Sequence, residues 1–192
     1  MRERGISTIS RRQNGFTLLE LMIAMAVGLI VLAAVYGVFI FQNKRYSIEE
    51  QIIEMQQNAR AAMTTMVREI RMAGYDPNFD AASQVITAAS TTFSFSTDDP
   101  SNNSTITYAF DSTNLKITRN INSGGDQPLA ENIQSLAFTY YDVNGTPTGT
   151  PSAVKGILIT ITARTSKPDS SYSSNGGYRT YALSSMVRPR NL

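Results

Sequence analysis

The chain contains neither cysteine nor histidine among its 192 residues. Disulfides and thiolate metal sites are therefore excluded, and cysteine usage says nothing about the redox compartment. The lack of histidine removes the commonest general base and a frequent metal ligand. The sequence also has no Gly-rich phosphate loop and no nucleophile elbow. We therefore expect a protein that is not an enzyme and that carries no cofactor and no metal.

A strong charge of either sign is lacking too, because 17 basic and 15 acidic residues leave a net charge of +2. Basic residues are not interleaved with aromatic ones, so we expect no nucleic acid partner. The charge is unevenly placed. Four arginines and one glutamate give residues 1–15 a charge of +3, and the thirteen basic and fourteen acidic residues that follow give the remainder −1. A basic segment before an apolar run keeps that end of the chain in the cytoplasm.

The apolar run from Leu21 to Phe41 contains 21 residues without a charge. As a helix it spans about 31 Å, which matches one bilayer core. It is longer than the apolar region of a cleaved secretory signal, which has about 7–15 residues. An uncleaved signal anchor would explain this hydropathy, but it does not explain Glu20, which stands directly before the run.

Glu20 places a carboxylate at the edge of the hydrocarbon, where ionisable groups usually have a partner. If the chain is cut after Gly15, the new terminus is the amine of Phe16. Positions i and i+4 share one face of a helix, so the Phe16 amine and Glu20 come within reach, in one chain or between neighbours. A negative charge in the first turn also suits the helix dipole. The alternative is a glutamate that merely snorkels to the headgroups.

These residues carry a family resemblance. The segment GFTLLELMIAMAVGLIVLAAVYGVF, residues 15–39, resembles the prepilin signature of type IV pilins and of type II secretion pseudopilins. In that signature a basic leader is followed by glycine, phenylalanine, a glutamate four residues later and about twenty apolar residues. The resemblance implies cleavage between Gly15 and Phe16 by a membrane prepilin peptidase and N-methylation of Phe16. It also implies that Glu20 pairs with the Phe16 amine of an adjoining subunit.

Beyond the apolar run, one apolar stripe continues at steps of three and four residues, which is typical of an amphipathic helix. Its members are Ile48, Ile52, Met55, Ala59, Met63, Met66, Ile70 and Ala73. Charged and polar residues between them, Glu69 included, are predicted to face solvent. Gly74 and the Asp76-Pro77 pair are expected to end the helix. A coiled-coil dimer is the rival explanation of the stripe.

From Gln84 onward the apolar period drops to two, which is typical of half-buried antiparallel strands. The predicted strands centre on 93–95, 106–110, 115–117, 136–140, 157–161 and 181–187. Asn114 and Asn144-Gly145 are predicted turns between strands. The apolar face of the strands and the apolar stripe of the helix are each expected to be buried against the other. We therefore predict an α+β, pilin-like fold in which a long N-terminal helix, first transmembrane and then amphipathic, packs on an antiparallel β-sheet.

The later part of the chain resembles one branch of pilins. REIRMAGYDP (68–77), LAENIQSLAFTYYD (129–142), VKGILITITART (154–165) and YRTYALSSMVRPRNL (178–192) resemble the PilW-type minor pilins. The chain also lacks two features of many major pilins: a proline midway along the membrane helix, where Gly37 stands, and a C-terminal cysteine pair. The resemblance implies a minor pilin that helps to initiate or cap a type IV pilus. Alternatives are a J-type pseudopilin of type II secretion and a membrane-anchored periplasmic enzyme or ligand-binding domain.

The expected organisation has four segments: a cleaved basic leader (1–15), a transmembrane half-helix (16–41), an amphipathic half-helix (42–75) and an antiparallel β domain (76–192). We expect a single-pass inner-membrane protein with its C-terminal domain in the periplasm, which then enters a pilus at the cell surface. The expected partners are other minor pilins, a major pilin and the prepilin peptidase, within a hetero-oligomeric filament.

Three polar stretches resemble functional sites, but each has a simpler structural explanation. Asp98-Asp99-Pro100 is predicted to be a turn rather than a metal site or an acid–base pair. The stretch from Asp142 to Gly145 carries two calcium-type oxygens but lacks the ligand count of an EF-hand. Residues 166–178, rich in serine and glycine, are interpreted as a flexible surface loop, or as a contact surface anchored by Tyr172 and Tyr178.

Overall fold

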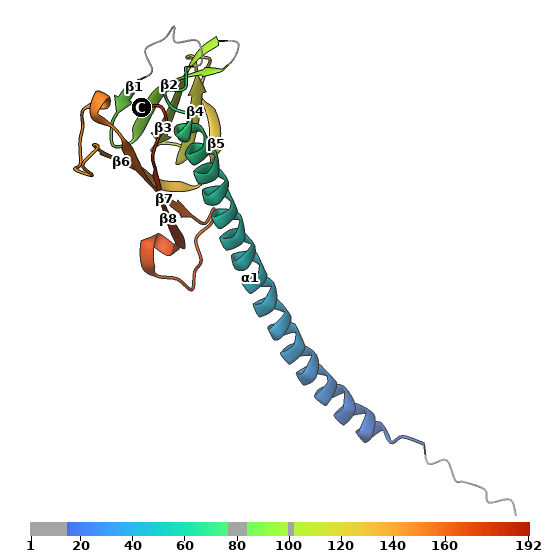
Figure 1. Cartoon of the computed structure of the whole chain (residues 1–192). Helices are drawn as coiled ribbons and strands as arrows, with labels where there is room; N and C mark the ends of the chain where they lie inside the picture. The colour runs from blue at the N-terminus through green and yellow to red at the C-terminus, as the bar shows by residue number, and fades with distance from the viewer. Residues whose placement is uncertain (1–14, 77–83, 100–101) are drawn as a thin grey trace, which may run out of the picture. The chain divides into compact units, whose positions relative to one another are not determined.

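The computed structural model describes residues 15–76, 84–99 and 102–192. Helix α1 (Leu18–Arg71) comes first, and eight antiparallel strands follow within these residues (Figure 1). The predicted α+β architecture, a long N-terminal helix packed on antiparallel β-structure, is confirmed. The chain divides into two compact units between Tyr46 and Ser47. The second unit, Ser47–Leu192, therefore holds both the amphipathic part of α1 and all the described strands.

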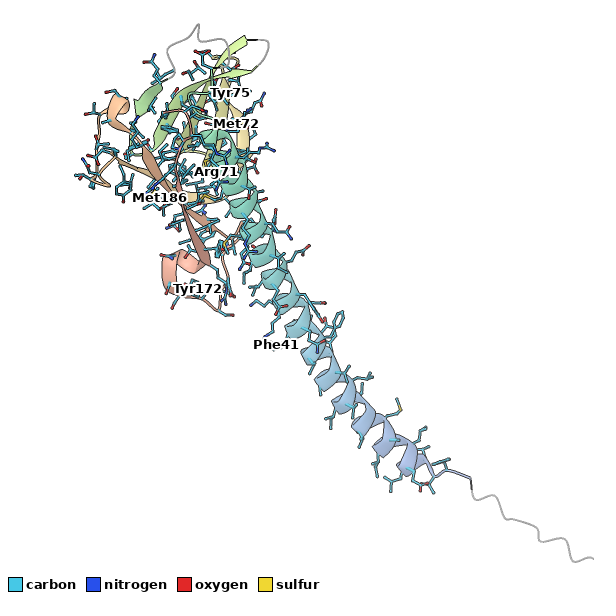
Figure 2. The ribbon with its side chains drawn as sticks, in the orientation of Figure 1. Phe41, Arg71, Met72, Tyr75, Tyr172 and Met186 are labelled. Carbon is cyan, nitrogen blue, oxygen red and sulfur yellow. The ribbon has the colours of Figure 1, made fainter. Side chains whose placement is uncertain are left out.

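In the first unit, the part of α1 from Leu18 to Tyr46 exposes its large apolar side chains. Those from Leu18 to Phe41 are between 49 and 77% exposed. The helix is long and apolar enough to cross a membrane, and none of its most apolar window is buried within the chain. Near the end of the apolar run the guanidinium of Arg45 lies 4.9 Å from the ring centroid of Phe41, which is labelled in Figure 2. The surface of this unit is therefore apolar, and its exposure to water is unfavourable.

In the second unit, the amphipathic part of α1 buries one face. The buried helical residues are Met55, Ala59, Ala62, Met63, Met66 and Ile70. All but Ala62 belong to the predicted stripe, and Ala73 just beyond the helix is buried as well. Ile48 and Ile52, at the start of the stripe, are half-buried. The stripe is therefore covered by the strands of the same chain, as predicted, and needs no coiled-coil partner.

Gly74 ends the helical region, as predicted. Its φ of 76° lies in the left-handed region, which favours glycine. Its N–H donates to the carbonyl oxygen of Ser96 at 2.8 Å. A Cβ atom here would stand 2.7 Å from Cδ2 of Leu192 and 2.8 Å from the carbonyl oxygen of Asn191. The C-terminus therefore packs closely on the end of the helix. Pro77, the other predicted stop signal, lies outside the described residues.

The first sheet has five strands in sequential order: β1 (Val85–Ala88), β2 (Thr92–Asp99), β3 (Asn102–Asp111), β4 (Lys116–Ile121) and β5 (Gln127–Ala130). Every neighbouring pair is antiparallel. The short strands β1 and β5 were not predicted. Leu115, predicted to lie in a strand, instead lies in the β3–β4 turn with a φ of 51°. Asn114 lies in that turn as predicted, and its N–H donates to the Asp111 carboxylate at 3.0 Å.

The second sheet has three antiparallel strands: β6 (Ile133–Tyr141), β7 (Gly156–Arg164) and β8 (Thr180–Val187). Short 3-10 helices, η1 (Pro151–Ala153) and η2 (Ser174–Gly177), stand in the two connections. Asn144 and Gly145 form a tight turn after β6, as predicted, and this turn brings Tyr141 opposite Pro147. The alternating pattern predicted these three strands, but it did not reveal that the strands of the chain form two sheets.

Aromatic side chains join the two sheets in the core. The ring of Phe93 on β2 lies 5.8 Å from the ring of Phe138 and 5.6 Å from the ring of Tyr140, both on β6. Such centroid separations are typical of favourable aromatic pairs. The Tyr140 hydroxyl donates to the carbonyl oxygen of Ala89 at 2.6 Å. Burial of this hydroxyl raises the pKa of Tyr140 above its ordinary value, so the group stays a donor at all physiological pH values.

Glu69 corrects one sequence-based prediction, because it does not lie on a solvated face. Its side chain is 16% exposed, and its Oε2 accepts hydrogen bonds from the Tyr108 hydroxyl and from Nε of Arg119, the latter at 2.9 Å. Burial, and then the bond to Glu69, raise the pKa of Tyr108 well above its usual range. Glu69 thus fastens α1 to β3 and β4. The charge is tolerated in this half-buried place because it is paired.

Candidate functional site

The predicted assembly residues lie at the start of α1. Gly15, Phe16 and Thr17 precede the helix, and Glu20 lies in its first turn. Phe16 is 90% exposed, and a Cβ atom at Gly15 would meet nothing within 4 Å. The Gly15–Phe16 peptide bond therefore stands clear of the described part of the chain, which suits attack by a second protein.

Thr17 and Glu20 form a capping box, in which each side chain bonds the backbone of the other. The N–H of Thr17 donates to Oε2 of Glu20 at 2.9 Å, and the N–H of Glu20 donates to Oγ1 of Thr17 at 3.2 Å. The Thr17 hydroxyl also donates to Oε2, at 3.0 Å. The first N–H groups of a helix have no partner inside it. Thr17 and Glu20 satisfy two such donors at this helix start.

The capping box leaves one oxygen of Glu20 for another partner. Within the described residues, each hydrogen bond that Glu20 accepts goes to Oε2 and comes from Thr17, not from Phe16. A carboxylate has about four acceptor positions, so Oε1 remains able to accept from an ammonium group. Thr17 thus holds the carboxylate in place without occupying it fully. Cleavage before Phe16 would leave the Phe16–Thr17 bond, and hence this N–H, unchanged.

Thr17 was not predicted to have a role. The signal was present in the sequence, since Thr17-Leu-Leu-Glu20 has the threonine-x-x-glutamate spacing of a capping box directly before an apolar run. The prediction considered Glu20 with the amine of Phe16 or with the headgroups, and it overlooked the hydroxyl three residues before it.

In the calcium-type stretch after β6, one carboxylate oxygen of Asp142 is used within the turn. Oδ1 of Asp142 accepts from the N–H groups of Asn144 and Thr146, each at 2.8 Å. This is an aspartate turn, in which the side chain takes the place of a backbone acceptor. No group of three or more carboxylate, cysteine or histidine side chains that could hold a metal occurs in the part of the chain that the structure describes. Asp98 and Asp99 end β2, and Pro100 of the predicted turn lies outside the described residues.

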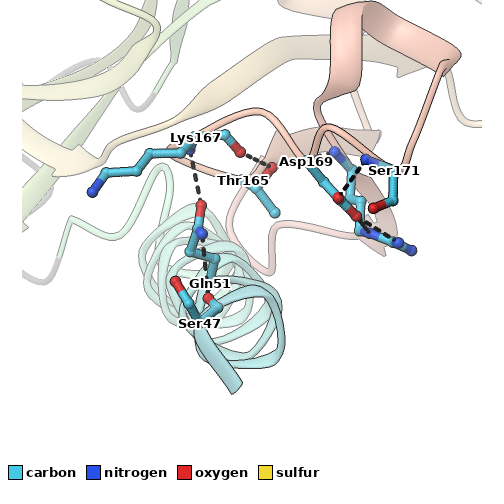
Figure 3. Close-up of polar contacts among 7 residues, drawn as sticks. Ser47, Gln51, Thr165, Lys167, Asp169 and Ser171 are labelled. Atoms are coloured by element: carbon cyan, nitrogen blue, oxygen red, sulfur yellow. Dashed lines mark hydrogen bonds and ion pairs between the residues drawn. The ribbon is translucent and has the colours of Figure 1, made fainter. Parts of the chain in front are cut away.

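The loop from Thr165 to Arg179 is anchored to both the helix and itself. Oε1 of Gln51 on α1 accepts from the N–H of Lys167 at 2.9 Å, and Nε2 of Gln51 donates to the carbonyl oxygen of Ser47 (Figure 3). Asp169 is 6% exposed and accepts from the N–H of Ser171 and from Nη2 of Arg179, both at 2.8 Å. These contacts tie the loop to the helix and to itself, and its predicted flexibility stays a prediction.

The two tyrosines of this loop have partners within the chain. The guanidinium of Arg179 lies 5.0 Å from the ring centroid of Tyr172, and that of Arg164 lies 4.2 Å from the ring of Tyr178. Gly177 has a φ of 90°, and a Cβ atom there would stand 2.9 Å from Cβ of Pro168. The rings therefore brace the loop. Their predicted use as contact anchors stays a prediction.

Asp169 makes this loop sensitive to acid. The N–H of Ser171, and then Arg179, lower the pKa of the Asp169 carboxyl from its ordinary value. A lowered pKa in the folded state adds stability above the unfolded pKa of about 3.9, and this stability is lost as the pH falls through the folded value. We expect amide exchange in residues 165–179, corrected for intrinsic rates, to be faster below pH 3 than at pH 6. Asp169→Asn should show fast exchange already at pH 6, and equal protection at both pH values in the wild type would contradict this role.

Residues 10–36 match the family described as the prokaryotic N-terminal methylation motif, the signal of type IV pilins and pseudopilins. The match covers the Gly15–Phe16 junction, Thr17, Glu20 and most of the exposed apolar segment. A search of curated proteins finds no match to the chain. The motif and the apolar helix together fit anchoring in the inner membrane, and they support a pilin-like or pseudopilin-like protein.

Proposed function

We propose that the chain is a minor pilin, a structural subunit that helps to initiate or cap a type IV pilus and that acts through contacts rather than catalysis. The observation that carries the proposal is the start of α1. A glycine–phenylalanine junction that is exposed within the described part of the chain precedes a glutamate held by Thr17, and an exposed apolar helix follows. Each part has a use in a filament of bundled helices: the junction yields an amine, Glu20 accepts it, and the apolar surface packs against other subunits.

The proposed pairing has a clear physical basis. Cleavage leaves an ammonium group on Phe16, which is costly in an apolar bundle unless an anion meets it. Glu20 of an adjoining subunit supplies that anion through Oε1, while Thr17 keeps Oε2 engaged. Charge-assisted hydrogen bonds of this kind are stronger than neutral ones. The pair therefore sets the axial position of one subunit against the next, and the domain Ser47–Leu192 selects neighbouring minor and major pilins.

The experiment that tests this function compares sheared surface filaments with membranes. We expect the tagged chain in the filament fraction at far lower amounts than the major subunit. We also expect fewer filaments when the chain is deleted. A chain confined to the inner membrane in piliated cells, with filament number unchanged by deletion, would contradict the proposal. A J-type pseudopilin shares the same motif, and it would instead be recognised by loss of protein secretion on deletion.

Processing provides a separate prediction. In cells with the prepilin peptidase, the mature chain should begin at Phe16. Gly15→Leu should leave a precursor that keeps residues 1–15, and Gly15→Ala should have a mild effect, because the peptidase of this family is expected to need a small residue before the cut. A Cβ atom at Gly15 would meet no described residue within 4 Å, so neither variant should disturb the fold. Intact-mass spectrometry of the purified chain distinguishes these forms, and normal cleavage of Gly15→Leu would contradict the prediction.

A further inference from the structure

The described strands present four sheet edges, namely β1 and β5 in the first sheet and β6 and β8 in the second. An open edge displays unpaired N–H and C=O groups and invites pairing with another chain. Proteins therefore protect their edges by short strands, prolines, bulges, charges or covering segments. The four edges of this protein differ sharply in this respect.

Three of the edges are protected. β1 has four residues and an irregular register, and β5 has four residues, one of which is Pro128. The outer side of β6 is covered by backbone contacts from the first sheet's connections. The N–H of Phe138 donates to the carbonyl oxygen of Ser90 at 2.7 Å, and that of Ile133 donates to the carbonyl oxygen of Leu115 at 2.8 Å.

The edge at β8 has none of these protections. The strand has eight residues, TYALSSMV, which include no charge and no proline. It pairs with β7 in unbroken register from Ile157 opposite Val187 to Arg164 opposite Thr180. Its other side has no backbone hydrogen bond to any described residue. Thr180, Ala182, Ser184 and Met186 are exposed on one face, and Met186 is 49% exposed. β8 is thus a long and open edge strand.

A groove of about 520 Å³ lies beside this edge. One wall is α1 from Met63 to Arg71 with Met72 directly after it, and the other is Ser185 of β8 with Arg190 beyond it. The groove's apolar side chains are Met63, Val67 and Met72, and its cations are Arg68, Arg71 and Arg190. Figure 2 labels Arg71 at the end of the helix, Met72 directly after it, and Met186 on β8. The N–H of Arg190 donates to the carbonyl oxygen of Arg71 at 3.2 Å, so the segment after β8 is tied to the helix at this groove.

The charges of the groove indicate what fits it. Among the described residues, none of the three arginines has an ion pair with a carboxylate. A second copy of β8 is a poor occupant, because the chain has no acidic residue from Ser170 to Leu192. Three cations beside an open strand edge instead suit an extended segment that carries carboxylates next to apolar side chains.

We propose that the free edge of β8 and the adjoining groove bind an extended, acidic segment of another protein, which adds to the second sheet as a fourth strand. Main-chain hydrogen bonds to β8 supply affinity. Alternate side chains of an added strand point to opposite faces. Every second side chain of the segment therefore faces the helix. Among these side chains, the apolar ones meet Met63 and Val67, and the carboxylates meet Arg68, Arg71 and Arg190. The site uses neither Phe16 nor Glu20, so it does not depend on the proposed filament assembly.

The test uses the full chain in detergent micelles and three fluorescent octapeptides. The first carries valine and glutamate in turn at every second position, with threonine between them, so that both face the same side of the strand. The second has lysine in place of glutamate, and the third is the acidic peptide methylated on every backbone nitrogen. We expect saturable binding of the first peptide by fluorescence anisotropy, with slower amide exchange at Thr180–Val187. The lysine peptide should not bind, because its positive charges are repelled by the arginines of the groove. The methylated peptide should fail because it has no N–H to donate to β8.

A double variant locates the binding. Arg68→Glu combined with Arg71→Glu should weaken the acidic peptide by about tenfold or more, because two favourable charges become repulsive. The matched control is Lys155→Glu with Lys167→Glu, which changes the net charge equally at two exposed lysines away from the groove lining. It should bind like the wild type. No saturable binding of the acidic peptide, equal binding of the lysine or methylated peptide, or equal weakening in the control would overturn the proposal.

Discussion

Glu20→Ala is expected to deplete the chain from filaments while its membrane insertion and its cleavage at Phe16 stay normal. Removal of a carboxylate makes insertion easier, because it takes a polar group away from hydrocarbon. In the filament, however, the Phe16 ammonium of the neighbour would lose its partner inside an apolar bundle. An uncompensated buried charge of this kind costs about 3 to 5 kcal/mol, enough to exclude the subunit.

Glu20→Gln separates charge pairing from helix capping. Glutamine can replace glutamate at the third helical position of a capping box, so this variant keeps the bond to the Thr17 backbone and loses the charge. If pairing matters, Glu20→Gln should be depleted from filaments like Glu20→Ala. Thr17→Val keeps the charge and removes the hydroxyl that holds Oε2. It should lower incorporation less, since a lost cap costs about 1 kcal/mol.

The measurement for these variants is the amount of the chain in sheared filaments divided by the amount in membranes. Intact mass serves as the control, because each variant should begin at Phe16. Normal filament levels of Glu20→Ala would show that the carboxylate only snorkels to the headgroups. Normal levels of Glu20→Gln with depletion of Glu20→Ala would show that capping, and not charge pairing, is what the filament requires.

Met66→Asp is expected to destabilise the domain formed by residues 42–192 by about 3 to 5 kcal/mol. Met66 is fully buried in the core between α1 and the strands. An aspartate there would place an unpaired carboxylate in an apolar environment, and it would also lose the packing of the methionine. Thermal unfolding of the soluble domain, followed by the near-ultraviolet circular dichroism of its tyrosines, measures the loss.

Two variants control for this result. Ala61→Asp introduces the same residue at an exposed position of the same helix. It should lower the free energy of unfolding by less than about 1 kcal/mol, through helix propensity alone. Met66→Leu keeps the volume of the side chain and should cost less than about 1.5 kcal/mol. A neutral Met66→Asp, or an Ala61→Asp of equal effect, would mean that the stripe of α1 does not face the strands.

Features that depend on local spacing were predictable from the sequence. The helix, its buried stripe from Met55 to Ala73 and the end at Gly74 follow from a period of 3.6 and from the conformational freedom of glycine. The strands other than β1 and β5 follow from a period of two. The position of Glu20 four residues after Phe16, at the start of an apolar run, was likewise readable. In each case the determining groups lie within a few residues of one another, so the pattern contains the cause.

Features that join distant segments were decided only in the tertiary structure. Glu69 looked like a solvated residue because its partners, Tyr108 and Arg119, are 39 and 50 residues away in the chain. The alternation of each strand was the same whether the strands formed one sheet or two. The open edge of β8 also has no local signal, because an edge exists only once every other strand has found its neighbour. Spacing along the chain therefore determined which elements form, and long-range packing decided which side chains and which edges remain for a partner.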